Sequence, residues 1–375
     1  MAVAGRRRQR DLEAVQQRAL NCHRIAASAL VSAFVLGGLG ATPASSEIVC
    51  DTGIAASSMA LFDAHDHLQV ASVAGGHTAL ANLEEEGVSR GVIAMSSPDP
   101  ANLGILLSLQ ASSTTPVFAF AMPPTFAPGG VKTYTEDTLT WIQNALEAGA
   151  RGIGEATLRH SGPPTLAAEI AANHEIAMAL YAEAASRGVP ISIHFETRQK
   201  SAPDVDIASR IAELRAALAA NPDSVLIWSH LGDTEAATVR ALIEDFDNLY
   251  ADLSTRNPYY ERGWPVTLQS LGEGSDGFGP LKPEWKDLFE DHSDRFLFGL
   301  DLANPDRVAQ LDAVVDYYRG VLGQLSQETA EKIACKNARA LLAAPSLPAA
   351  GFPMLMVLAS LFVATGSAWA RRQGG

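Results

Sequence analysis

Two histidines, His65 and His67, stand two positions apart at the end of an apolar run that begins at Leu61. Side chains two residues apart on a strand point to the same face, so both imidazoles face the same way. Imidazoles beside carboxylates are the usual ligands of zinc and related metals. Other histidines and acidic residues end other apolar runs. Each alone is weak evidence, but together they predict a metal centre with the ligands His65, His67, Glu155, His194, His230 and Asp301.

The apolar runs that end in these residues are short and continuous, which is typical of strands buried on both faces. Helical periodicity lies between them, most clearly at 166–187, 206–220 and 327–342. Alternating strands and helices predict an α/β fold with a parallel sheet. We expect a single-domain (β/α)8 TIM barrel rather than an open doubly wound sheet, because no glycine-rich phosphate loop follows the first strand. The expected strands are 61–64, 91–95, 117–121, 152–156, 191–195, 225–229, 249–253 and 296–300.

The order of the predicted ligands resembles the metal-dependent amidohydrolase superfamily. Its pattern is His-x-His on strand one, an acidic residue or carboxylated lysine on strand four, histidines on strands five and six, and aspartate on strand eight. The resemblance covers 61–342; segments 62–68, 295–301 and 337–339 resemble the amidohydrolase-2 family, and 152–155 is closer to TatD-like members. Leu302 and Ala303 differ from the usual continuation after strand eight, which leaves the substrate open.

The resemblance implies how one or two divalent ions would be held. No lysine ends an expected strand, so Glu155 takes the strand-four position. Zinc is the expected metal, with manganese, iron or nickel as alternatives. Asp301 would accept the proton of the attacking water, and His230 would stabilise an oxyanion if only one ion binds. The first ion would bind to His65, His67 and Asp301, and the second to His194 and His230, with Glu155 between them.

Three side chains near the expected barrel mouth are candidates for substrate binding. Arg159 and His160 follow strand four, and Arg256 follows strand seven. An arginine at a barrel mouth can bind a carboxylate or phosphate through two parallel hydrogen bonds. A surface ion pair is the alternative for each arginine. Glu196 is a candidate to orient a ligand histidine. The long segment 257–283, rich in glycine and proline, is a candidate lid.

These features predict a hydrolase that uses metal-activated water on an amide, lactone or ester bond of a small molecule. Phosphoester hydrolysis, non-oxidative decarboxylation and a non-catalytic surface binding protein are the alternatives. The formal net charge is -14, from 28 basic and 42 acidic side chains. A surface this acidic repels phosphate backbones, so nucleic acid is not expected as a partner. The oligomeric state stays open.

Both ends of the chain carry targeting patterns, which leaves 45–345 for the barrel. Residues 1–44 combine arginines, an apolar run and small residues, as a secretory signal peptide does, although an uncleaved anchor is the alternative. The tail, 346–375, holds 20 uncharged residues from Gly351 to Ala370, followed by two arginines. This order resembles a sorting signal read by a sorting protease, or a plain transmembrane anchor. We therefore expect an exported protein in the periplasm or on the cell surface, anchored to the membrane.

Two of the three cysteines lie within the expected barrel domain. Cys50 precedes the first strand, and Cys335 lies in the last helix. A closed barrel brings these regions together, and an exported protein meets oxidising conditions. The sequence therefore raises the hypothesis of a Cys50–Cys335 disulfide, with two free thiols as the alternative.

Overall fold

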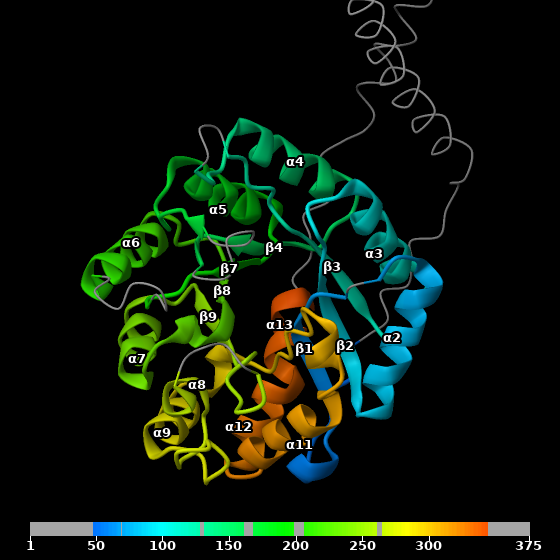
Figure 1. Cartoon of the computed structure of the whole chain (residues 1–375), viewed down its shortest axis with the longest axis vertical. Coiled ribbons are helices and arrows are strands. Elements are labelled where there is room, and N and C mark those ends of the chain that lie inside the picture. The colour runs from blue at the N-terminus through cyan, green and yellow to red at the C-terminus, as the bar shows by residue number, and fades with distance from the viewer. Residues whose placement is uncertain are drawn as a thin grey trace, which may run out of the picture. The chain divides into compact units, whose positions relative to one another are not determined.

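Eight parallel strands surround a central axis, with helices around them, in the computed structural model (Figure 1). The strand order is the chain order, and β1 and β10 close the ring, because Ala64 N donates to Phe298 O at 2.9 Å and Asp301 N donates to His65 O at 2.6 Å. The predicted TIM barrel is confirmed. The structure describes residues 48–68, 70–127, 131–160, 168–198, 206–260 and 265–343.

The strands lie where the apolar runs predicted them, with ends shifted by no more than three residues. The last strand is the shortest, because only two of the five predicted residues pair with β9. The bounds are β1 Leu61–Asp66, β2 Val88–Met95, β3 Val117–Ala121, β4 Gly152–Thr157, β7 Ile191–His194, β8 Leu226–Trp228, β9 Leu249–Asp252 and β10 Phe296–Leu297.

The helices of the described residues pack mainly on the outside of the ring (Figure 1). A five-residue π-helical turn, Lys332–Lys336, interrupts the predicted helix 327–342. The α-helices are α2 Val73–Glu85, α3 Pro100–Ser112, α4 Glu136–Glu147, α5 Glu175–Arg187, α6 Ile207–Ala220, α7 Ala236–Asp245, α8 Val266–Gln269, α9 Pro283–Asp291, α10 Pro305–Val308, α11 Leu311–Leu322, α12 Gln327–Glu331 and α13 Asn337–Ala343.

The prediction of a helix from 166 is wrong at its start. The helix α5 begins at Glu175, after His174, whose side chain accepts a hydrogen bond from Ile176 N at 3.2 Å. Before it, β5 Arg159–His160 and β6 Ala168–Glu169 form a short antiparallel pair. The predicted end is confirmed, because Gly188 ends the helix at a φ of 63°, a conformation that glycine adopts without strain.

Side chains on the strands alternate between two apolar layers. Phe62 and Phe120 fill the barrel interior, whereas Leu61 and Ala119 pack toward the helices. Gly91 leaves room for the Phe62 ring, because a Cβ on Gly91 would lie 2.3 Å from it. At the base of the barrel, α13 adds Ala338 and Leu342 to the interior layer.

A disulfide joins Cys50 to Cys335, with 5.7 Å between their Cα atoms. The hypothesis of a bridge is confirmed. The bond ties the segment before β1 to the π-helical turn before α13.

The predicted signal segment, 1–44, and the predicted tail, 346–375, lie outside the described residues. Among the residues that are described, no helix is long and apolar enough to cross a membrane. The candidate lid, 257–283, is described except for 261–264 and is pinned by internal hydrogen bonds, such as Gln269 Nε2 to Asn257 O at 3.0 Å. Its role as a lid stays a prediction.

Candidate metal centre

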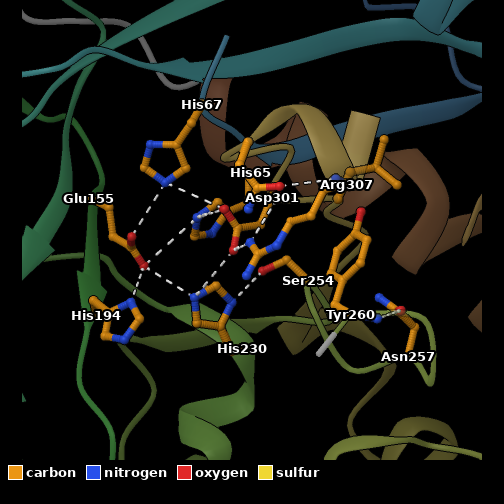
Figure 2. A network of polar contacts seen from close by, with 12 residues as sticks. His65, His67, Glu155, His194, His230, Ser254, Asn257, Tyr260, Asp301 and Arg307 are labelled. Carbon is orange, nitrogen blue, oxygen red and sulfur yellow. Dashed lines mark hydrogen bonds and ion pairs between the residues drawn. The ribbon is translucent and has the colours of Figure 1, made fainter. Parts of the chain in front are cut away.

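All six predicted ligands lie at the carboxyl ends of the strands, at one mouth of the barrel, and their polar atoms face one another (Figure 2). Glu155 lies in the middle. Its Oε1 is 2.9 Å from His194 Nδ1 and 3.4 Å from His230 Nε2, and its Oε2 is 3.4 Å from His67 Nε2. Asp301 Oδ1 lies 3.6 Å from His67 Nε2. The sequence therefore selected side chains that do converge.

The donor atoms form overlapping groups that fit a divalent cation. Within each group the ligand atoms lie within 4.8 Å of one another. His65 Nε2 and Asp301 Oδ1 are buried and make no hydrogen bond within the described part of the chain, although each lies close to other ligand atoms. Buried polar atoms normally have a partner, and a cation would supply one here. The groups are His65, His230 and Asp301; His65, His67 and Glu155; and Glu155, His194 and His230.

A buried carboxylate on β9 orients two of the histidines. Asp252 Oδ2 lies 3.0 Å from His65 Nδ1, and Asp252 Oδ1 accepts hydrogen bonds from the backbone N–H groups of His230 and Ser254, each at 3.0 Å. Ser254 Oγ also donates to Asp252 and lies 2.8 Å from His230 Nδ1. These contacts occupy the Nδ1 atoms and turn both Nε2 atoms toward the centre.

Sequence reasoning missed Asp252 and Ser254. Asp252 is the second-last residue of the expected strand 249–253, close to the strand end as Asp301 is to that of 296–300, and this was the available signal. Glu196, in contrast, was a candidate to orient a ligand. Its Oε1 lies 3.2 Å from His194 Nε2, which leaves His194 Nδ1 facing Glu155.

Charge in the centre is unevenly distributed. Burial lowers the pKa of His65, but the carboxylates of Asp252 and Glu155 outweigh burial and raise it to about 10. Burial is likewise outweighed at His194, where Glu155 raises the pKa to about 10. For Asp301, burial acts to raise the pKa, but Arg307 and His65 hold it well below its usual range. In the absence of a metal, the nearby carboxylates therefore stabilise the protonated forms of His65 and His194.

The three predicted substrate-binding residues have different surroundings. Arg256 is fully buried, donates to the carbonyls of Gln269 and Leu268, each at 2.9 Å, and stacks on Trp285. Backbone carbonyls surround its guanidinium, including that of His230 at 3.4 Å from Nη1, and its role in substrate binding stays a prediction.

Arg159 bears out the alternative of an ion pair. Its Nη2 lies 2.6 Å from Glu213 Oε1, and its Nη1 lies 2.8 Å from Glu169 Oε2. Two glutamates therefore pair with this guanidinium, and its role in substrate binding stays a prediction. His160 lies beside the centre, with its ring centroid 4.1 Å from that of His194, and its role in substrate binding stays a prediction.

A parallel barrel with histidines and carboxylates at its mouth is the arrangement of a metal-dependent enzyme. Residues 80–343 match the family model described as amidohydrolase. The chain therefore belongs to the amidohydrolase family, and it is a metal-dependent enzyme of that superfamily. The match begins after His65 and His67, which the fold adds to the site. None of the curated proteins compared with the sequence matches it.

Solved structures resemble the chain in fold. An uncharacterised TIM-barrel protein from Bordetella bronchiseptica is 13% identical, with a TM-score of 0.51 over 76% of this chain and 99% of its own. Dihydroorotase from Campylobacter jejuni is 14% identical, with a TM-score of 0.51 over 76% of this chain and 83% of its own. A 2,6-dihydroxybenzoate decarboxylase is 15% identical, with a TM-score of 0.46 over 76% of this chain and 98% of its own.

Replacing Asp252 by Asn should weaken metal binding about 10- to 100-fold without unfolding the barrel. An amide NH2 in place of Oδ2 cannot accept a hydrogen bond from His65 Nδ1–H. The tautomer that leaves Nε2 unprotonated for the metal is therefore no longer stabilised. Metal content after dialysis against graded chelator measures the effect. Asp245→Asn removes a surface carboxylate that pairs with Arg215 and is the matched control. Equal metal retention in the two variants would contradict the role of Asp252.

Metal binding near pH 7.5 should release protons, on the order of one to two per ion, because ligation requires neutral imidazoles. His65 and His194 hold protons below a pKa of about 10. Apparent metal affinity should therefore rise as the pH rises toward 10. Calorimetric titration of metal-free protein with Zn²⁺ or Mn²⁺, in two buffers of different ionisation enthalpy, counts the protons. His194→Gln should release fewer, and a heat independent of the buffer would argue against protonated ligands.

Proposed function

We propose that this protein hydrolyses an amide, lactone or ester bond of a small molecule, with water as the nucleophile. The observation that supports this most is the asymmetry of Asp301. Arg307 binds its Oδ2, whereas Oδ1 faces the histidines without a hydrogen-bond partner among the described residues. One oxygen is thereby fixed in place, and the other is left to accept a proton.

The chain's own residues supply distinct parts of the proposed reaction. The predicted ligands would hold one or two divalent ions, which would lower the pKa of water and polarise a carbonyl oxygen. Asp301 Oδ1 then takes the proton of the attacking water and delivers it to the leaving group. His230 Nε2, set by the contact of Nδ1 with Ser254, serves as a ligand or, with a single ion, as a donor to the oxyanion.

One experiment separates the proposed hydrolysis from its three alternatives. Purified protein of measured metal content is assayed with a panel of lactones, amides and phosphodiesters, and with hydroxybenzoates for carbon dioxide release. Turnover of lactones or amides supports the proposal. Phosphodiester cleavage or decarboxylation would redirect it to those reactions, and bound metal without any turnover would favour a binding protein.

Asp301→Asn should lower hydrolysis about 10²- to 10⁴-fold, because an amide oxygen is not a usable base. The fold should persist, as circular dichroism and thermal unfolding can check. Asp306→Asn, which changes an exposed carboxylate on the nearby helix α10, is the matched control and should keep nearly full activity. Unchanged activity of the Asp301 variant would refute its role as the proton acceptor.

We also propose that the protein is exported and acts in the periplasm or at the cell surface, held to the membrane by its C-terminal tail. The disulfide supports this proposal, because such bonds persist in oxidising compartments. Mass spectrometry of protein isolated from cell fractions should find an N-terminus at Ser45. Intact residues 1–44 in a cytosolic fraction would refute export.

A further inference from the structure

The guanidinium of Arg307 lies beside the carboxylate of Asp301, the proposed proton acceptor. Arg307 sits on α10, where Asn304 Oδ1 accepts a hydrogen bond from Arg307 N at 3.1 Å and fixes the start of the helix. The side chain reaches toward the ligand cluster, where Nη1 binds the carboxylate of Asp301 and donates to Asp301 O at 2.9 Å (Figure 2). Arg307 is therefore part of the mouth, although sequence reasoning did not select it.

An aromatic ring supports the guanidinium. The Cζ of Arg307 lies 4.8 Å from the centroid of the Tyr260 ring, and such stacking limits where a flexible arginine can point. Tyr260 is 3% exposed, and its backbone N–H donates to Asn257 Oδ1 at 3.2 Å. Its hydroxyl is buried and has no hydrogen-bond partner among the described residues. Burial and the nearby Asp301 raise the pKa of Tyr260, so this hydroxyl stays a donor.

Arg307 has donors to spare. A guanidinium has five N–H groups in a rigid fork. Both hydrogen bonds that the Arg307 guanidinium makes with the described residues leave from Nη1, so its Nε and Nη2 keep three donors. The Arg307 side chain is 17% exposed, so the guanidinium is not fully buried and a ligand can approach it. Arg159 differs, because glutamates already bind all three of its nitrogens.

We propose that Arg307, assisted by the Tyr260 hydroxyl, binds a carboxylate of the substrate. The Nε and Nη2 edge of a guanidinium matches the two oxygens of a carboxylate. The substrate of the proposed hydrolase is then an anionic molecule, an amide, lactone or ester that also carries a carboxylate. The inference rests on the proposed function for the reaction, but not for the binding of the anion.

Hydrolysis of a matched pair of lactones tests selectivity. The pair is γ-butyrolactone and its 5-carboxylate, which differ only in the charged group. The wild type should prefer the carboxylated lactone in kcat/KM, and Arg307→Met should reduce that preference about 10- to 100-fold, mainly through KM. Both substrates should also lose some kcat, because Asp301 loses its partner. An equal loss on both lactones would show that Arg307 only positions Asp301, and would overturn the proposal.

Binding separates this inference from the proposed function, because it needs no turnover. Glutarate and 2-hydroxyglutarate, the product of the carboxylated lactone, are titrated calorimetrically into protein of measured metal content. Arg307→Met should weaken both about 10- to 100-fold. Wild-type protein that binds neither anion at millimolar concentration, or a variant that binds them as tightly, would overturn the proposal even if hydrolysis is found. Absence of hydrolysis with Arg307-dependent binding would overturn only the proposed function.

Two further variants control for charge and folding. Arg240→Met removes the same charge from α7, where Arg240 pairs with Asp291, and should leave selectivity and binding unchanged. Arg307→Lys keeps the charge but loses the fork, so its selectivity should fall between those of the wild type and the methionine variant. If Arg307→Met does not fold, Arg307→Lys decides: wild-type selectivity in that variant would contradict bidentate binding.

Discussion

The burial of several carboxylates at one barrel mouth is the constraint on which the rest of the structure depends. An ionised carboxylate taken out of water needs a positive or hydrogen-bonding partner. Among the described residues, Asp63 and Asp66 form no ion pair with an imidazole. Burial raises the pKa of Asp66 to about 7 and that of Asp63 well above its usual range. The facing histidines, in contrast, keep Glu155 and Asp252 ionised, with lowered pKa values. The mouth therefore has a charge pattern that a divalent cation completes.

The same carboxylates help to close the barrel. Asp63 Oδ1 accepts hydrogen bonds from His65 N at 2.9 Å and Leu300 N at 3.0 Å, which joins β1 to the segment after β10. Asp252 connects the end of β9 to β1 through His65 and to the turn after β8 through His230. The site and the closure of the sheet are thus built from shared groups, so removing a carboxylate here affects both metal binding and the geometry of the strand ends.

Much of the fold and the centre could be predicted because each depends on local rules. Continuous apolar runs mark buried parallel strands, and the ligands follow those runs directly. Arg256 and Arg307 could not be distinguished in this way. Both follow strand ends, but Arg256 is buried among backbone carbonyls, whereas Arg307 is partly exposed and binds the carboxylate of Asp301. The folded contacts, not the strand pattern, separate the two. The start of α5 was missed for a similar reason, since strand pairing, not periodicity, sets residues 168–169 apart.

The two ends of the barrel divide stability and function between them. At the base, α13 fills the interior, and the disulfide between Cys50 and Cys335 fixes the turn before it. At the mouth, His230 and Asp301 adopt φ values of 61° and 55°, a region that costs non-glycine residues about 1–3 kcal/mol. Such strain persists only where surrounding contacts determine the backbone, and here those contacts are the hydrogen bonds from His230 N to Asp252 and from Asp301 N to His65 O. Packing and the disulfide stabilise the end of the barrel opposite the mouth. The mouth can therefore keep a strained backbone conformation that positions the ligands.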